Sequence, residues 1–273
     1  MKPYHLNFLI YRWLSHRDFL ETFNHNYELY LKIRDENPRL FSDKERRILD
    51  NRQIKEAAVH MLQQLDIVSQ ILNVMQSDSS NLSDAMEGWL TLLNSPVLSE
   101  DLKSEVKKKM DKAVTPHHIL AKMVSTTGGG IDMPVEMKQM AIEFVGKINV
   151  QFPAILAAFE VEDTSVFPAS AFNASIRNVM DPINYWRHVK KNTLMEPLRR
   201  FCDMAVRLLS CPPSSAGLER TFSAFGLIHS KLRNRLSNER VMKLVRVYCH
   251  LRDTEGTDLD NFLQVQMAED IQE

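Results

Sequence analysis

The sequence predicts a mainly α-helical protein, and three observations carry this prediction. Glycine occurs 8 times in 273 residues, about half of what average usage would give. Residues that favour helices, such as methionine, leucine, lysine and glutamate, are frequent. Apolar residues also recur at steps of three and four along most of the chain. We therefore expect a multi-helix bundle with a sizeable buried core.

The first two predicted helices cover residues 16–34 and about 43–75. Asn37-Pro38 ends the first, because proline disfavours helical angles at the preceding residue. Ser42 or Asp43 can cap the second. We expect its apolar seam to pack on neighbouring helices of the bundle. The seam consists of seven residues at alternating steps of four and three: Ile54, Ala58, Met61, Leu65, Val68, Leu72 and Met75.

Shorter helices are predicted further along the chain. Three of them cover about residues 83–93, 99–112 and 116–124. Gly128-Gly129-Gly130 is interpreted as a flexible linker, because it lacks the flanking residues of a phosphate loop. A helix opens at Pro134, and Pro153 kinks or restarts it. Residues 161–178 look irregular, with a short extended piece around 165–167. Three helices are expected in the last third, the last two over about 215–230 and 238–252.

Composition excludes several classes of protein. Cys202, Cys211 and Cys249 are too few and too scattered for a disulfide framework or a structural zinc site. No apolar stretch approaches the roughly 18 residues of a membrane-spanning helix. The N-terminus lacks the pattern of a signal peptide. We therefore expect a soluble intracellular protein with neither a membrane nor a small-molecule partner.

The basic residues are unevenly distributed. Residues 185–252 hold fourteen Lys and Arg against four Asp and Glu, although the whole chain has a net charge of −1. Such a segment can contact an anionic partner such as DNA, or it can be a solvated helix surface. The candidate phosphate contacts of the basic 187–252 segment are Lys190, Lys191, Arg199, Arg200, Lys231, Arg233, Arg235, Arg240, Lys243 and Arg246.

One carboxylate stands out on the predicted helix at 215–230. At helical spacing Glu219 shares a strip with the small residues Ser223, Gly226 and Ser230. With partner carboxylates from elsewhere, it could hold a hard cation such as Mg²⁺. The alternative is an ion pair with a basic residue such as Arg220.

The same part of the chain resembles the C-terminal region of hAT-family DNA transposases. The resemblance rests on a series of fixed offsets: Tyr185-Trp186, Pro197-Leu198, Pro213, Ser214-Ser215-Ala216, Glu219-Arg220, Phe222-Ser223, Gly226 and Arg233-Asn234-Arg235-Leu236. Leu218 departs from the pattern, which usually has a small residue there. Upstream the resemblance is weaker, at Arg12-Trp13 with Ser15 and at Leu82-Ser83-Asp84 with Trp89.

The resemblance implies an RNase H-like origin and a metal-dependent site that is incomplete in this chain. Family members bind two divalent ions through two Asp and one Glu, and Glu219 matches that Glu by motif. Arg12 and Trp13 match residues that the family places near the flipped base. Only eleven residues precede Arg12, so we expect the strands that carry both Asp residues to be absent. The sequence predicts no transposase activity and no cofactor; Mg²⁺ or Mn²⁺ would act only in a complete parent enzyme.

The family's C-terminal block is also its dimerisation region, which implies four segments here. They are a helical insertion-like region (1–130), a helix with an irregular connection (131–180), the dimerisation region (181–253) and an acidic tail (254–273). The candidate dimerisation or core residues are Trp186, Leu198, Phe201, Ala205, Leu208, Leu209, Phe222, Phe225, Val241, Leu244, Val245 and Tyr248. Without the sheet of the parent, the apolar faces of the Leu198 and Val241 helices are expected to be partly uncovered.

The leading hypothesis is a transposon-derived protein that pairs with itself or with related hAT-derived proteins. One alternative is a non-catalytic DNA-binding module. Another is a fragment of an active transposase from an incomplete gene model. The resemblance to the family implies a nuclear location. The sequence itself contains no long run of Lys and Arg that would mark an import signal.

Overall fold

The computed structural model describes residues 7–126, 133–228 and 237–255. Thirteen α-helices and two 3-10 helices form the secondary structure of these ranges, and they include no strand. The mainly α prediction is therefore confirmed. The chain divides into two compact units. The first comprises residues 1–75 and 79–213, and the second comprises residues 76–78 and 214–273.

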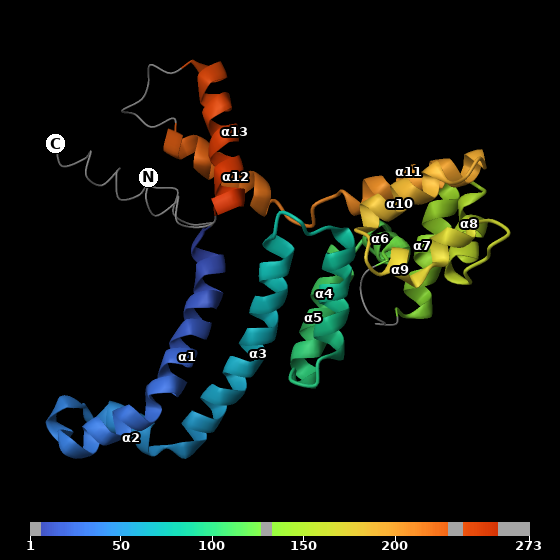
Figure 1. The fold of residues 1–273 in the computed structure, drawn as a ribbon. Helices are drawn as coiled ribbons and strands as arrows, with labels where there is room; N and C mark the ends of the chain where they lie inside the picture. Colours follow the sequence, from blue (N-terminus) through green and yellow to red (C-terminus); the bar gives the residue numbers. More distant parts are fainter. Residues whose placement is uncertain (1–6, 127–132, 229–236, 256–273) are drawn as a thin grey trace. The chain divides into compact units, whose positions relative to one another are not determined.

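The first unit begins with three helices that we call the arm (Figure 1). They are α1 (Asn7–Glu36), α2 (Asp43–Asp50) and α3 (Arg52–Gln76), with η1 (Pro38–Leu40) between the first two. Ser42 caps α2, and the Glu45 carboxylate accepts a bond from the Ser42 N–H, so both ends of a capping box are present. The prediction of one continuous helix from 43 to 75 is wrong. The extended backbone of Asn51 separates α2 from α3, and its side chain accepts the N–H of Gln53.

The remaining helices of the first unit form what we call the body. In chain order they are α4 (Leu82–Asn94), α5 (Glu100–Ala113), α6 (Pro116–Val124), α7 (Val135–Ile148), α8 (Phe152–Glu160), η2 (Ala169–Phe172), α9 (Ala174–Arg177), α10 (Pro182–Lys191) and α11 (Glu196–Leu209). Pro116 and Pro182 stand in the first turn of their helices, where a missing N–H costs nothing. The predicted glycine linker at 128–130 lies outside the described residues.

No extended piece exists at residues 165–167, where the sequence predicted one. The segment is a turn built on Asp163, whose carbonyl accepts the Phe167 N–H at 3.0 Å. The Asp163 carboxylate accepts both the N–H and the hydroxyl of Ser165, and these bonds lower the pKa of Asp163. The turn directs Phe167 inward, so its aromatic ring is buried rather than presented on a strand.

The body core is aromatic and centres on Trp186. Its ring lies 4.9 Å from that of Phe159 and 5.6 Å from that of Phe201, centroid to centroid. The indole Nε1 donates to the Val124 carbonyl at 2.8 Å, which joins α10 to the end of α6. Tyr185 donates its hydroxyl to the Ala171 carbonyl at 3.2 Å. Both polar groups of the buried aromatic pair are thus satisfied.

The second unit contains α12 (Ala216–Ile228) and α13 (Asn238–Glu255). The two helices pack on each other (Figure 1). Their common core has five buried residues: Ala224, Ile228, Val241, Val245 and Tyr248. Arg220 forms an ion pair with Asp78, which joins the first turns of α12 to residues 76–78 of the same unit.

Candidate interaction surfaces

The inner faces of α10 and α11 are part of the body core. Leu198, Phe201 and Ala205 follow a helical stripe on α11, and all three are fully buried. Leu208, Leu209 and Trp186 are buried in the same cluster. The expectation that the Leu198 face is partly uncovered is therefore wrong, because helices α4, α6, α8 and α10 pack against α11. These residues stabilise the unit and are not available to a partner.

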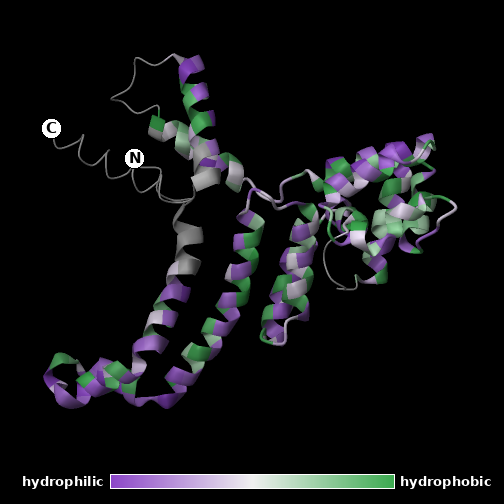
Figure 2. Ribbon diagram, viewed as in Figure 1, coloured by the Kyte–Doolittle hydropathy of each residue, from purple (hydrophilic) through white to green (hydrophobic). Residues whose placement is uncertain are grey.

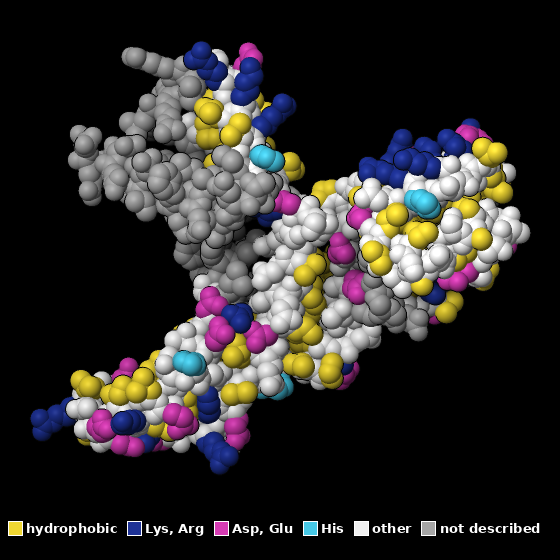
Figure 3. Space-filling view, viewed as in Figure 1, with side chains coloured by type: hydrophobic (Ala, Val, Ile, Leu, Met, Phe, Trp, Pro, Cys, Tyr) yellow, Lys and Arg dark blue, Asp and Glu magenta, His cyan; other side chains and the backbone are white. Residues whose placement is uncertain are grey.

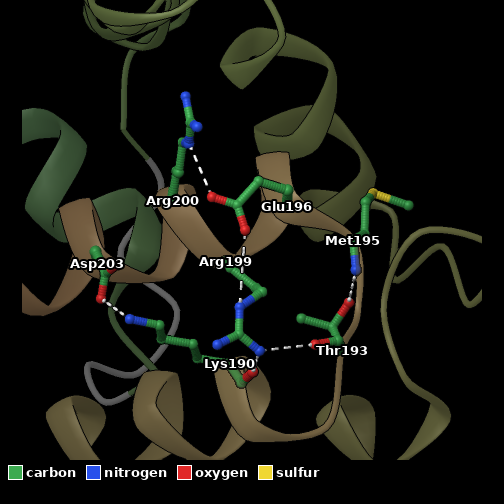
Figure 4. A network of polar contacts seen from close by, with 7 residues as sticks. All are labelled: Lys190, Thr193, Met195, Glu196, Arg199, Arg200 and Asp203. Carbon is green, nitrogen blue, oxygen red and sulfur yellow. Dashed lines mark hydrogen bonds and ion pairs between the residues drawn. The ribbon is translucent and has the colours of Figure 1, made fainter.

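The outer side of α10 and α11 carries a network of ion pairs (Figure 4). Lys190 Nζ lies 2.6 Å from Asp203 Oδ1, and Arg200 Nε lies 3.0 Å from Glu196 Oε1. Arg199 donates to the carbonyls of Lys190 and Thr193 at 3.4 and 3.3 Å. Two predicted phosphate contacts, Lys190 and Arg199, thus also connect the two helices. Exposed ion pairs of this kind contribute about 0–1 kcal/mol each, so an incoming anion can replace them at small cost.

This outer side is nevertheless basic overall. Residues 182–209 hold six Lys and Arg against two Asp and Glu, a net charge of +4. Lys191 is exposed and has no ion-pair partner among the described residues. Figure 3 shows the basic side chains gathered over α10 and α11. The surface can therefore attract an anion, although the acidic side chains of Glu196 and Asp203 also lie on it.

The other predicted DNA contacts are on different elements. Arg240, Lys243 and Arg246 are exposed on α13, where Lys243 pairs with Glu239 at 2.7 Å. Lys231, Arg233 and Arg235 lie outside the described residues. Arg12 and Trp13 belong to α1, but the description of side chains begins at residue 15. The predicted contacts are therefore split between two units, and the DNA-binding site stays a prediction.

Glu219 lies in the first turn of α12 and is exposed. Its Oε1 accepts the hydroxyl of Ser215 at 2.7 Å, one turn earlier. Arg220 pairs with Asp78, so the ion pair considered between Glu219 and Arg220 is not the one that forms. A methyl group added at Gly226 would meet nothing within 4 Å, which leaves the small-residue strip beside Glu219 open.

Among the residues that the structure describes, no group of three His, Cys, Asp or Glu is arranged to hold a metal ion. The catalytic role of Glu219 and the absence of a cofactor therefore stay predictions. The same part of the chain contains no helix long and apolar enough to cross a membrane.

The apolar residues of the second unit divide into a covered and an uncovered set. Val241 on α13 is fully buried against α12, but the apolar side of α13 is partly uncovered at Leu244, as expected for this helix. Phe225 is partly buried beside this core. In contrast, Leu218 and Phe222 on α12 are 64% and 71% exposed. On α13, Leu244 is also exposed.

Helix geometry explains the division on α12. Ala224 and Ile228 are one turn apart and face α13. Leu218 and Phe222 are also one turn apart, but their row lies more than about 100° further round the helix. A single neighbour cannot cover both rows. The row at Leu218 and Phe222, which we call the α12 ridge, therefore has no intramolecular partner among the described residues of the second unit.

The observations define an all-helical protein with an aromatic body and a small two-helix unit that buries few of its apolar residues. Residues 163–248 match the family model of the hAT family C-terminal dimerisation region. This part of the chain is therefore similar to a hAT C-terminal region, and the resemblance to the C-terminal part of hAT transposases is confirmed over these residues. No curated protein matches the chain.

The matched region begins upstream of the predicted boundary at 181. The structure gives a reason, because Phe167 packs against Trp186 at 6.3 Å between ring centroids. Phe159 and Phe167 are core residues that were not predicted from the sequence. Their aromatic character within a stretch with no clear helical period was the available signal. The matched region thus comprises η2, α9, α10, α11, α12 and most of α13.

Proposed function

We propose that the chain dimerises with a second copy or with a related hAT-derived protein, and that the α12 ridge forms the contact. The observation that carries the proposal is the exposure of Leu218 and Phe222 inside a region matched as a dimerisation region. A fully buried Leu or Phe side chain contributes about 1.5–3 kcal/mol relative to an exposed one. Covering the ridge therefore supplies a favourable term that the monomer lacks.

The small core of the second unit supports the same proposal. Five residues form it, and an isolated pair of helices of this size is marginal in water. A partner helix laid on the α12 ridge would turn the pair into a bundle with two buried rows. A two-fold contact would place the same ridge of both copies against each other.

The mass of the purified protein tests the proposal. Light scattering after size-exclusion chromatography should give at least twice the protomer mass of 31.6 kDa at micromolar concentration. Phe222→Asp places a charge in the proposed contact and should raise the dissociation constant of this contact at least about 100-fold. Val179→Asp is the matched control, because Val179 is 82% exposed in the first unit. Equal masses for wild type and Phe222→Asp would refute the role of the ridge.

We further propose that the chain by itself does not cut DNA. The motif-matched carboxylate of Glu219 belongs to no group of three His, Cys, Asp or Glu that could hold a metal ion among the described residues, which supports the proposal. Incubating supercoiled plasmid with the protein and Mg²⁺ or Mn²⁺ tests the proposal. Nicking that disappears in Glu219→Gln would overturn it.

A nuclear location is proposed on the hAT region alone, and imaging of a tagged full chain would check it.

A second candidate function is DNA binding without catalysis. The net charge of +4 on α10 and α11 favours it, as does Lys191, which has no ion-pair partner among the described residues. Binding to a duplex should weaken steeply with salt, because each neutralised phosphate releases counterions. Arg207, a further basic residue, is exposed on α11. Lys191→Glu with Arg207→Glu should abolish binding, whereas Lys109→Glu with Lys112→Glu on α5 should have little effect. Equal losses in both pairs would indicate general electrostatic attraction.

A further inference from the structure

The turn between α10 and α11 presents a large apolar side chain to solvent. Leu194 is 99% exposed, the highest value of any large hydrophobic residue in the described part of the chain. Met195 beside it is 42% exposed. We call residues 192–195 the tip. Leu194 lies outside both the body core and the α12 ridge, so neither of these features explains it.

An exposed hydrophobic residue alone does not mark a binding site, because much of any protein surface is apolar. The seam on α3 is an example. Its predicted packing on neighbouring helices holds for Ala58, which is buried, but the prediction is wrong for three exposed residues: Ile54, Met61 and Leu72. Figure 2 shows hydrophobic and hydrophilic residues mixed along α3. Leu194 differs in the hydrogen bonds that fix its backbone and in the charge around it.

Hydrogen bonds on both sides of Leu194 fix the backbone of the tip. The side-chain amide of Asn192 donates to the His188 carbonyl at 2.9 Å. The N–H of Met195 donates to the hydroxyl oxygen of Thr193 at 3.2 Å, and Thr193 itself is buried. Leu194 is therefore held in solvent on an ordered turn, and a preorganised contact loses little conformational entropy on binding.

Basic side chains lie against the tip. The Arg199 guanidinium donates to the carbonyls of Thr193 and Lys190 at 3.3 and 3.4 Å, so it touches the residue that precedes Leu194 (Figure 4). Lys191 is exposed in the last turn of α10. Three residues of chain extend over at most about 11 Å, so the backbone of Lys191 is within this distance of that of Leu194.

The surroundings of the tip are positive in spite of two acidic neighbours. Residues 187–200 contain five Lys and Arg against Glu196, and Asp203 is the second acidic neighbour, which leaves a net charge of +3. Arg200 already pairs with Glu196 at 3.0 Å, and Lys190 pairs with Asp203 at 2.6 Å. Exposed ion pairs of this kind are weak, so a polyanion can compete for both cations.

An apolar side chain among cations favours duplex DNA over a protein as the partner of the tip. A protein would need acidic side chains arranged around an apolar pocket. Any duplex, in contrast, supplies phosphates on both sides of its stacked bases. Leucine is also among the side chains that proteins insert between base steps as apolar wedges. The tip thus offers Leu194 to the bases and its basic neighbours to the phosphates.

We propose that the tip binds duplex DNA and that Leu194 enters a base step as an apolar wedge, while Lys191 and Arg199 neutralise adjacent phosphates. This inference rests on the candidate DNA-binding function and adds to it a mode of binding. Insertion requires unstacking of the step, so mismatched pairs and flexible TA steps are favoured over G·C-rich sequence. The preference then comes from the deformability of the duplex, without base-specific hydrogen bonds.

The fluorescence of 2-aminopurine, which rises when the base unstacks, tests the insertion. The full chain is titrated into short duplexes that carry this base beside a mismatch, a TA step or a G·C-rich step, and the anisotropy of an end label reports binding. Leu194→Ala and Leu194→Phe are compared with the wild type, because phenylalanine is also a wedge residue. Val179→Ala is the matched control, since Val179 is 82% exposed in the segment that precedes α10, at the other end of this helix from the tip.

We expect the wild type to bind the mismatched duplex at least about 5-fold more tightly than the G·C-rich duplex and to raise the emission of 2-aminopurine. Leu194→Ala should lose both effects but keep the salt dependence of binding, because the phosphate contacts remain. Leu194→Phe and Val179→Ala should behave like the wild type. Since Leu194 is almost fully exposed, its substitution should leave the circular dichroism spectrum unchanged.

Four outcomes would overturn the proposal. An absence of binding to every duplex would also refute the candidate DNA-binding function. Equal affinity for all duplexes without a rise in emission would refute the wedge alone, as would a rise that persists in Leu194→Ala. A lower mass of Leu194→Ala than of the wild type in light scattering would assign Leu194 to a contact between protein chains instead.

Discussion

The body and the arm are both built from amphipathic helices, but they bury their apolar side chains to very different extents. In the body, Trp186, Tyr185, Phe159, Phe167 and Phe201 are all almost completely buried in one cluster. In the described part of the arm, Tyr27, Leu49 and Ala58 are the buried hydrophobic residues. Eight large hydrophobic residues of the arm are exposed: Phe19, Leu29, Leu40, Ile54, Val59, Met61, Leu72 and Val74.

The difference follows from how many neighbours each helix has. In the body, α11 contacts α4, α6, α8 and α10, so its apolar stripe is covered along its length. The arm consists of an antiparallel pair joined by α2, and a pair of helices can cover only the facing side of each member. Polar bonds hold that pair together instead, among them the bond from Arg17 to Asp66 at 2.6 Å and the bond from Lys55 to Asn24 at 2.9 Å. Amphipathic helices therefore form a core only where further helices surround them.

The largest expected effect concerns the centre of the body. Trp186→Ala should lower the free energy of unfolding of the body by about 3–5 kcal/mol, because it opens a cavity in a fully buried cluster. Trp186→Phe should cost about 1–3 kcal/mol, since the Val124 carbonyl loses its donor. Urea denaturation followed by circular dichroism measures both. A cost below 1 kcal/mol for Trp186→Ala would contradict the view that the body is a single packed core.

A smaller effect is expected where α3 meets α4. A methyl group at Gly88 would lie 2.7 Å from Cγ2 of Ile71, too close to be accommodated without movement. Gly88→Ala should cost about 1–3 kcal/mol from overpacking, offset by about 1 kcal/mol of improved helix propensity. The double variant Gly88→Ala with Ile71→Ala should recover stability relative to Ile71→Ala alone. Additive costs in thermal unfolding would show that the two residues do not pack together.

Within the arm, Tyr27→Phe should cost about 1 kcal/mol. The substitution removes the hydroxyl donor to the Leu49 carbonyl and leaves the ring in place. Hydrogen exchange should speed up in α1 and α2 and stay unchanged in the body, because stability is not uniform across a structure. Faster exchange throughout the first unit would mean that the arm and the body unfold together.

The smallest effect is a pH dependence at the start of α4. Burial raises the pKa of Asp84, whose Oδ2 accepts the Asn81 N–H at 2.8 Å, beside the ion pair of Lys122 with Glu87. A carboxyl with a raised folded pKa stabilises fully below its unfolded pKa of about 3.9, and this contribution is lost as pH rises through the folded pKa.

Asp84→Asn keeps a side-chain acceptor but cannot ionise, so it escapes that loss. Its stability relative to the wild type should therefore improve as pH rises from 4 to 7. Urea denaturation at the two pH values gives the difference, with Asp101→Asn on exposed α5 as the control. A relative stability that falls as pH rises would contradict the stated sign.

The sequence by itself determined the helical class, many helix ends and the hAT region. These features depend on neighbours along the chain: Pro116 and Pro182 start their helices, and Asn81 with Asp84 caps α4. The motif spacing around Ser214-Ser215-Ala216 and Glu219-Arg220 can likewise be recognised from the sequence without knowing any tertiary contact. The break at Asn51 is local too, but no proline or glycine marks it.

Only the tertiary structure decided which apolar faces are covered. The stripes at Leu198 on α11 and at Met61 on α3 have the same helical periodicity, yet the first is buried and the second is exposed. Periodicity shows that one side of a helix is apolar, whereas coverage depends on helices that come from distant parts of the chain. The turn at Asp163 and the inward position of Phe167 depend on the same long-range packing, because Phe167 is held by Trp186.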